Sequence, residues 1–95
     1  MNKILLVGCG SLGKIILEVL ISPKNKITVL EKKLEKRKKI NFSNVNVIKD
    51  YDSDITENFD YVLICVKPKD CINFLKKIKK KKINKIFISF VAGLS

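Results

Sequence analysis

Three glycines occur at the spacing G-x-G-x-x-G, directly after an apolar run, in the segment LLVGCGSLGK at residues 5–14. Each glycine has a separate mechanical role where a strand turns into a helix. Gly8 makes the tight turn, Gly10 lets the backbone come close to a bound phosphate, and Gly13 lets the helix pack against the sheet. The segment therefore predicts a strand, a turn and a helix whose first amides face an anion.

Apolar runs of strand length recur along the rest of the chain. We expect five strands, at residues 3–7, 26–30, 45–48, 60–66 and 85–90. Strands that alternate with helical segments pair in parallel through right-handed crossovers. The sequence thus predicts the α/β fold class, with a parallel sheet of about five strands in the order 3-2-1-4-5 and helices in layers on both faces.

The segments between these strands have helical spacing. Residues 12–20 carry apolar side chains at Leu12, Ile15, Ile16, Val19 and Leu20. Residues 32–40 predict a polar, peripheral helix whose few apolar contacts are Leu34 and Ile40. Ser53 is expected to cap a short helical turn that carries Ile55 and Phe59. Asp70 is expected to cap a helix with an inward face of Cys71, Ile72, Leu75 and Ile78.

A crevice is expected where the strand order reverses, at the carboxyl ends of the first and fourth strands. The glycine segment, Glu31, the pair Lys67 and Pro68, and the pair Ala92 and Gly93 all fall at this edge. Glu31 follows the last glycine by 18 residues, where a carboxylate accepts hydrogen bonds from an adenosine ribose. A carboxylate there repels the 2′-phosphate of NADP and so favours NAD. The preference is slight, because the nearby cations Lys32, Lys33 and Arg37 cancel much of this repulsion.

The net charge of +11 raises the alternative of a nucleic-acid-binding or interaction module. Among the 20 cationic residues only Arg37 is an arginine, whereas recognition of phosphates and bases favours arginine. Aromatic residues do not interleave with the basic runs, and the densest run, 76–82, lies at a helix end far from the crevice. We therefore interpret the lysines mainly as solvated surface, and keep a basic module on the same scaffold as the alternative function.

Three cysteines, Cys9, Cys65 and Cys71, occur without a C-x-x-C pair, and the chain contains no histidine. We expect reduced thiols and no metal site. Cys9 lies near a helix N-terminus, where a thiol pKa can fall, but we expect its backbone to matter more than its thiol. Cys65 and Cys71 are interpreted as small apolar residues of the interior. No secretory signal or membrane-spanning apolar run is present, which favours a cytoplasmic location.

Three stretches of the chain resemble the signature stretches of one enzyme family: VGCGSLGK at residues 7–14, ICVKPKD at 64–70 and ISFVAGLS at 88–95. Together they are similar to the N-terminal, Rossmann-like NAD(P)-binding domain of pyrroline-5-carboxylate reductase, over essentially the whole chain. The resemblance implies reduction of 1-pyrroline-5-carboxylate to proline by hydride from NADPH or NADH.

The resemblance also implies which residues bind the cofactor. They form a pyrophosphate loop at Gly8, Cys9, Gly10, Ser11, Leu12 and Gly13, a ribose and nicotinamide side at Val66, Lys67 and Pro68, and a nicotinamide and substrate border at Ala92 and Gly93. Glu31 departs from the pattern, because members of the family often have a less acidic residue there. This departure leaves the choice of cofactor open.

Members of that family continue past the alanine-glycine turn into a helical domain that forms the dimer and completes the substrate site. We therefore expect one domain over residues 1–95 that is catalytically silent alone and associates with a separate chain or with itself at the edge of the fifth strand. β-Hydroxyacid and prephenate dehydrogenases share the first half of this architecture, and a methyl-donor site can also use a glycine-rich first loop. The lysine-proline turn and the regular glycine spacing favour the dinucleotide reductase.

Overall fold

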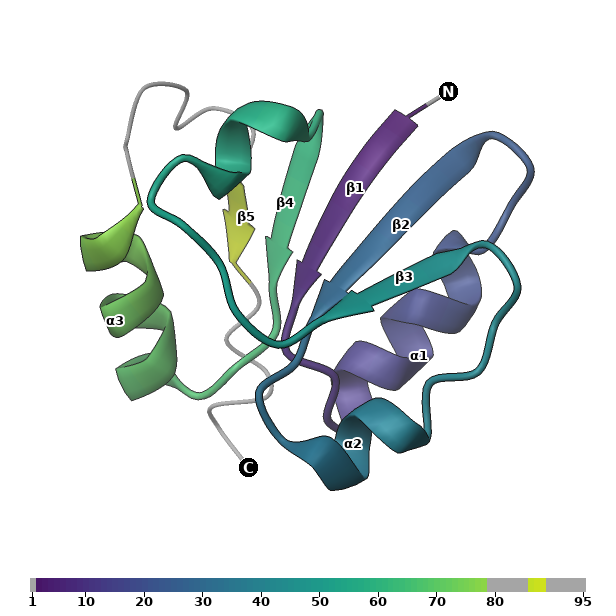
Figure 1. The fold of residues 1–95 in the computed structure, drawn as a ribbon, viewed down its shortest axis with the longest axis horizontal. Coiled ribbons are helices and arrows are strands. Elements are labelled where there is room, and N and C mark those ends of the chain that lie inside the picture. Colours follow the sequence, from purple (N-terminus) through teal and green to yellow (C-terminus); the bar gives the residue numbers. More distant parts are fainter. Residues whose placement is uncertain (1, 79–85, 89–95) are drawn as a thin grey trace.

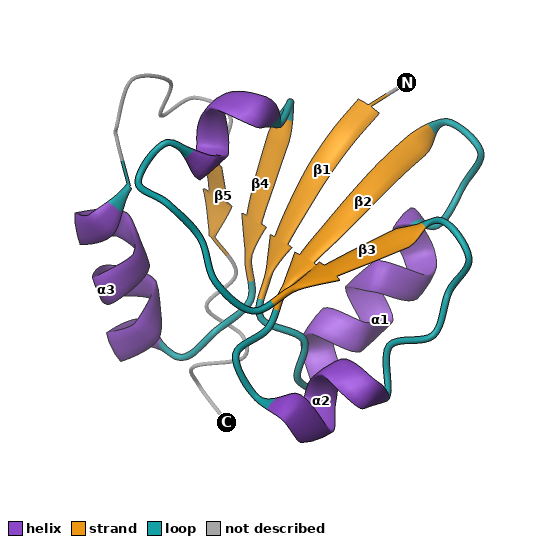
Figure 2. Ribbon diagram, viewed as in Figure 1, coloured by secondary structure: helices purple, strands orange, loops and turns teal. Residues whose placement is uncertain are grey.

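A computed structural model describes the chain at residues 2–78 and 86–88. The described elements alternate between strand and helix along the sequence (Figures 1 and 2). In chain order they are β1 (Asn2–Val7), α1 (Ser11–Leu20), β2 (Asn25–Leu30), α2 (Leu34–Lys38), β3 (Val45–Ile48), the short 3₁₀ helix η1 (Ile55–Asn58), β4 (Tyr61–Ile64), α3 (Pro68–Lys77) and β5 (Ile86–Ile88).

All paired strands run parallel, in the order β3-β2-β1-β4-β5. The register places Val7 beside Leu30 on one side and beside Ile64 on the other, so the central strands end at the same edge. Parallel neighbours require a long crossover, which α1, α3 and the segment carrying α2 supply. The predicted fold class and strand order are confirmed.

Two apolar cores lie on opposite faces of the sheet, because successive side chains of a strand point to opposite faces. Leu5 and Val7 of β1 pack toward α3 and η1, with Phe74 and Ile55 among their neighbours. Ile4 and Leu6 pack on the other face, where α1 contributes Leu17. The four β1 residues from Ile4 to Val7 are at most 5% exposed, as a strand buried on both faces requires.

The face of α1 that meets the sheet is narrower than the sequence pattern suggested. Leu17 is fully buried and Ile16 and Leu20 are partly buried, whereas Ile15 is 59% and Val19 78% exposed. Ile15 and Val19 lie four residues apart and therefore share one side of the helix, turned away from the sheet. The helix predicted from this spacing is confirmed, and these two of its apolar residues do not pack against the sheet.

In α3, two sequence predictions need correction. The helix begins at Pro68 with Lys67 as its N-cap, so Asp70 lies in the first turn and is not the cap. Proline suits the first helical position because that residue needs no amide donor there. The buried residues are Cys71, Phe74 and, just past the helix, Ile78, whereas Ile72 is 52% exposed.

α2 and β4 are shorter than the sequence predicts, whereas β3 has the predicted bounds and β1 and β2 each begin one residue earlier. α2 is confined to Leu34–Lys38 and buries no residue, because its polar sequence offers no apolar face. η1 has Asp54 as its N-cap and no side-chain cap hydrogen bond, so the cap expected at Ser53 is wrong. β4 and β5 lie within the predicted ranges, and residues 89 and 90 fall outside the described part. No described helix is long and apolar enough to cross a membrane.

Candidate functional site

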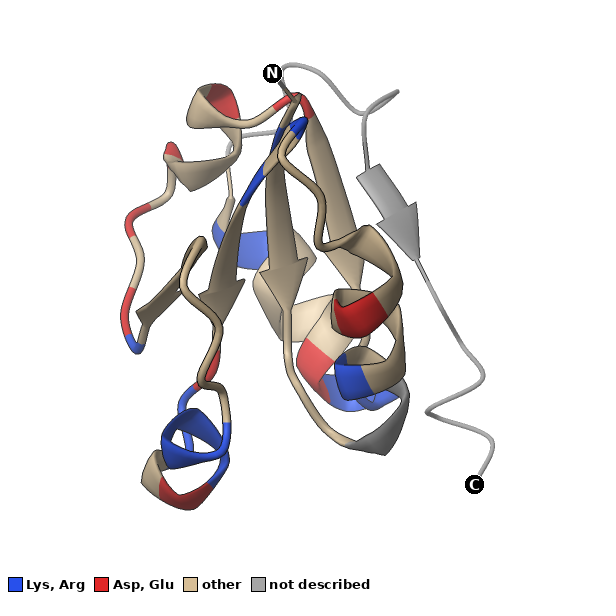
Figure 3. Ribbon diagram, turned by 90° about the vertical axis from the view of Figure 1, so that its right-hand side faces the viewer, with Lys and Arg blue, Asp and Glu red and all other residues tan. Residues whose placement is uncertain are grey.

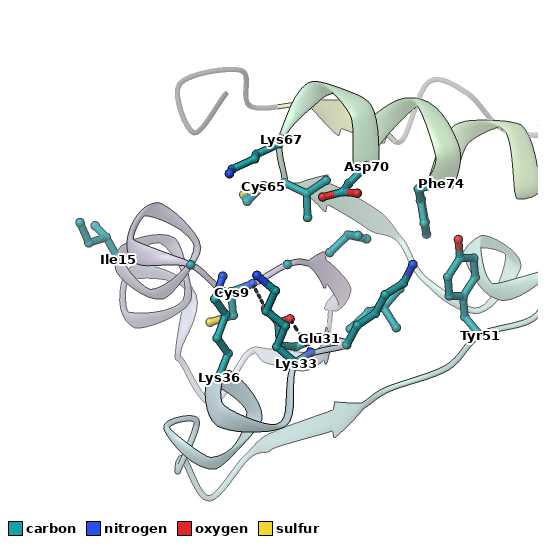
Figure 4. Close-up of a pocket in the computed structure, with 16 residues that line it drawn as sticks. Cys9, Ile15, Glu31, Lys33, Lys36, Tyr51, Cys65, Lys67, Asp70 and Phe74 are labelled. Atoms are coloured by element: carbon teal, nitrogen blue, oxygen red, sulfur yellow. Dashed lines mark hydrogen bonds between the residues drawn. The ribbon is translucent and has the colours of Figure 1, made fainter. Parts of the chain in front are cut away.

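A pocket of about 720 Å³ opens at the carboxyl ends of β1, β2 and β4 (Figure 4). Its walls come from the glycine loop after β1, the turn after β2, the turn after β4 and one side of α3. The pocket lies where the order of the strands reverses between β1 and β4, as in open α/β sheets generally. The lining residues are Val7, Gly8, Cys9, Gly10, Ile15, Leu30, Glu31, Lys32, Lys33, Lys36, Tyr51, Cys65, Val66, Lys67, Asp70 and Phe74.

Gly8 and Gly13 are required by the packing of the protein itself. Gly8 has a φ of 86°, and a Cβ there would run into the Val66 side chain and lie 3.1 Å from the Cys65 carbonyl oxygen. A Cβ on Gly13 would lie 2.8 Å from the Gly8 carbonyl oxygen. These two glycines therefore let the turn form and let α1 approach the strand ends, as their spacing predicts.

Gly10 is different, because nothing in the described protein fills the space that its missing side chain leaves. The nearest atom to a Cβ built there is Lys36 Nζ, at 3.8 Å. Gly10 is also the N-cap of α1 and provides no side-chain cap, so the first amides of the helix lack the partner that a Ser or Asp would supply. An open backbone beside unpaired helix amides suits the close approach of an anion.

The amides of Gly8 and Cys9, in the loop before the helix, donate hydrogen bonds to other parts of the protein. The Gly8 N–H donates to the Leu30 carbonyl oxygen at 2.8 Å, and the Cys9 N–H donates to Glu31 Oε1 at 2.9 Å. The amides of Gly8 and Cys9 are therefore already paired with protein oxygens.

Glu31 is a buried carboxylate, 7% exposed, at the end of β2. Besides the Cys9 amide, it accepts a hydrogen bond from the Lys33 N–H, which reaches Oε2 at 3.0 Å. Figure 4 shows these two bonds on either side of the carboxylate. Each oxygen retains a further lone pair that could accept a ribose hydroxyl.

Four lysines line the pocket: Lys32, Lys33 and Lys36 from the β2 side, and Lys67 from the β4 side. Arg37 does not join them. Its Nη1 donates to the carbonyl oxygens of Glu31, at 3.1 Å, and Lys32, at 2.6 Å, so this guanidinium clamps the turn after β2. α2, which carries Lys36, Arg37 and Lys38, lies at the end of the sheet where the pocket opens (Figure 3).

The three cysteines are buried and free. Burial and the nearby Glu31 carboxylate raise the pKa of the Cys9 thiol, more than Lys14 and Lys36 lower it. Burial raises the pKa of Cys65 to about 11 and also raises the pKa of Cys71. A lowered thiol pKa at the start of α1 is thus absent. The described residues contain no cluster of His, Cys, Asp and Glu side chains able to hold a metal ion.

Sequence reasoning missed the aromatic wall of the pocket. The rings of Tyr51 and Phe74 are 5.1 Å apart between centroids, and Lys77 Nζ lies 4.1 Å from the centre of the Tyr51 ring. Tyr51 follows β3 by three residues, so the rule that ligands lie at the carboxyl ends of strands points to it. Asp70, interpreted from the sequence as a cap, also lines the pocket.

Of the predicted cofactor residues, the pocket brings together Gly8, Cys9, Gly10, Glu31, Val66 and Lys67. Ser11, Leu12 and Gly13 form the first turn of α1 beside it, and Pro68 begins α3. Ala92 and Gly93 lie outside the described residues.

The five-stranded parallel sheet, the glycine turn and the pocket at the switch of strand order define a Rossmann-like nucleotide-binding domain. The chain belongs to the family described as "NADP oxidoreductase coenzyme F420-dependent", whose model matches residues 3–93. It is therefore a domain of the pyridine-nucleotide oxidoreductase type, and its family implies a dinucleotide cofactor. Searches of curated proteins and of solved structures found no match.

Proposed function

We propose that the pocket binds NAD(P) with its pyrophosphate over Gly10 and the first turn of α1. The observation that carries this proposal is the open space at Gly10, where the nearest atom of the described residues to a Cβ placed there is the Lys36 ammonium nitrogen, 3.8 Å away. Gly8 and Gly13 have packing reasons to be glycine, but packing gives no reason for Gly10. A close backbone approach by a ligand supplies that reason.

The other walls fit the remaining parts of a dinucleotide. Glu31, with free lone pairs at the end of β2, would hold the adenosine ribose, and Lys32, Lys33 and Lys36 line the pocket close to it in sequence. Val66 and Lys67 would hold the nicotinamide side, with Pro68 fixing the turn into α3. When bound in its reduced form, the nicotinamide supplies the hydride, and the protein supplies position and exclusion of water.

We further propose that the chain serves a pyrroline-5-carboxylate reductase, which forms proline in the cytoplasm. The support is the valine-lysine-proline turn after β4 together with the glycine turn after β1, both of which resemble that family, and both of which lie at the pocket. The residues described above account for cofactor binding and not for a substrate site. We propose that Ala92, Gly93 and a partner chain or a second copy of this chain complete the substrate site.

Titration of the purified chain with NADH and with NADPH, followed by nicotinamide fluorescence, tests cofactor binding. We expect saturable binding that is abolished by excess oxidised cofactor. The ratio of the two dissociation constants measures whether the Glu31 carboxylate or the pocket lysines dominate. Absence of binding by both cofactors would refute the proposal.

Disruption of the gene that encodes the chain tests the substrate. We expect a requirement for proline that is relieved by proline and not by 1-pyrroline-5-carboxylate. Relief by 1-pyrroline-5-carboxylate would place the defect before this reaction, and growth without any supplement would contradict the assignment.

A further inference from the structure

The Glu31 carboxylate is bound on both of its oxygens by the protein backbone. Its carboxylate is 7% exposed, and both of its oxygens accept backbone amides, from Cys9 at 2.9 Å and from Lys33 at 3.0 Å. Hydrogen bonds to a charged group are among the stronger ones in proteins, and burial strengthens them further.

The backbone of Glu31 is held as firmly as its side chain. Its N–H donates to the Ile48 carbonyl oxygen at 2.9 Å, which ties it to β3. Its carbonyl oxygen accepts Arg37 Nη1 at 3.1 Å, and the same nitrogen reaches the Lys32 carbonyl oxygen at 2.6 Å. Glu31 is therefore fixed from β3 and from α2 before its carboxylate reaches the glycine loop.

Cys9, the residue that Glu31 holds, has a buried side chain that packs in the core, while its peptide lies between two glycines. Gly8 is fixed by its bond to the Leu30 carbonyl oxygen and by its positive φ. Gly10 has open space around it and no side chain with which to cap α1. Cys9 lies between them, and its amide donates to the Glu31 carboxylate. Within the described part of the chain, that carboxylate therefore holds the Cys9 peptide at the turn from β1 into α1.

We infer that Glu31 is a positioning residue, whose carboxylate holds the Cys9 peptide and so sets the direction in which α1 presents its first amides to the pocket. This role precedes ligand binding and differs from that of a ribose acceptor, which would act only when cofactor is bound. The importance of this positioning for cofactor binding rests on the proposed function. The hydrogen bond between the Cys9 amide and Glu31 does not. Arg37 supports the same arrangement by clamping the turn that carries Glu31.

Amide hydrogen exchange of the ligand-free chain, resolved by residue with NMR, tests this role. In Glu31→Gln one oxygen becomes an NH₂ group, which cannot accept, and the charge is lost. We expect the Cys9 and Lys33 amides to exchange about tenfold faster or more. The amides of Leu5 and Leu6, inside β1, should keep their rates. Glu35→Gln, an equal change of charge at an exposed residue of α2, is the control and should alter neither amide.

A second variant keeps the test decisive if Glu31→Gln fails to fold. Arg37→Gln removes the clamp on the Glu31 and Lys32 carbonyl oxygens and leaves the carboxylate in place. We expect faster exchange of the Cys9 amide here too, by a smaller factor. Wild-type exchange at Cys9 in whichever variant is folded would overturn the assignment. Because no cofactor is present, that result is distinct from a failure of the chain to bind NADH or NADPH.

Discussion

Gly8 and Gly10 are two residues apart in one motif, yet the structure gives them opposite reasons to be glycine. Gly8 has a φ of 86° and has Val66 against the position of its missing Cβ. Gly10 has an ordinary φ of −78° and open space. At the scale of single residues, Gly8 therefore has a packing reason to be glycine, whereas the described residues give none for Gly10.

Gly8→Ala and Gly10→Ala make that contrast measurable. We expect Gly8→Ala to lower the free energy of unfolding by about 2 to 4 kcal/mol, from strain at positive φ and overpacking against Val66. Gly10→Ala should cost less than about 1 kcal/mol, since only the helix cap changes. Urea unfolding of the two variants and the wild type checks both values.

The same Gly10→Ala variant should bind NADH and NADPH at least about tenfold more weakly, because a methyl group then stands where the pyrophosphate approaches. The nicotinamide fluorescence titration measures this loss. A stable Gly10→Ala chain with unchanged affinity would contradict the placement of the pyrophosphate.

The thiol of Cys65 gives the fold a dependence on alkaline pH. Burial raises its pKa from 9.0 to about 11, so between these values the unfolded chain releases a proton that the folded chain retains. The contribution to stability is complete below pH 9 and is lost as the pH rises toward 11. Between pH 8.5 and 10, we expect wild type to lose about 1 kcal/mol more than Cys65→Ala in urea unfolding. Parallel pH profiles of the two chains would contradict this.

At the scale of elements, the strands were easier to predict than the helices. β1, β2 and β4 are continuous apolar runs because both of their faces are covered, and such runs are visible without knowing the partner. A helix buries only one side of its surface. Exposed apolar residues such as Ile15 and Ile72 are of the same residue types as the buried ones, so residue type alone does not identify the buried side. Which side is buried depends on packing against the sheet, which a single sequence does not contain.

Phe74 and Ile72 of α3 test that distinction. Phe74 is 3% exposed and packs against Tyr51 and the sheet, whereas Ile72 is 52% exposed. We expect Phe74→Ala to lower the free energy of unfolding by about 3 to 5 kcal/mol. Ile72→Ala, a truncation on the same helix, should change it by less than about 0.5 kcal/mol. Equal losses in chemical denaturation would show that α3 is packed differently.

At the scale of the whole molecule, the site residues that directly follow a strand could be predicted from the sequence. Contacts between side chains that are distant in the sequence could not. The strand order predicts Gly10, Glu31 and Lys67 at one edge of the sheet, and the pocket contains all three. The hydrogen bond from the Cys9 amide to Glu31 joins residues 22 positions apart and has no sequence signature. The pairing of Tyr51 with Phe74 likewise arises only when α3 crosses the sheet.

The chain has a net charge of +11. Lysines that line the pocket and lysines far from it can be substituted separately, which distinguishes dinucleotide binding from nucleic-acid binding. Lys24 and Lys26 lie at the amino end of β2, opposite the pocket, whereas Lys33 and Lys36 line it. Non-specific attraction to DNA depends on total charge, while a bound phosphate depends on cations at the site.

Two double variants with equal charge changes separate these cases. We expect Lys33→Gln with Lys36→Gln to weaken dinucleotide binding at least about tenfold, because ammonium contacts to phosphate are lost. Lys24→Gln with Lys26→Gln should leave it unchanged, and both pairs should weaken low-salt association with duplex DNA to a similar extent. Fluorescence titration and a DNA-binding assay across salt concentrations supply the measurements. If DNA affinity survived physiological salt and dinucleotide affinity ignored Lys33 and Lys36, the basic interaction module would replace the oxidoreductase domain as the explanation of the pocket.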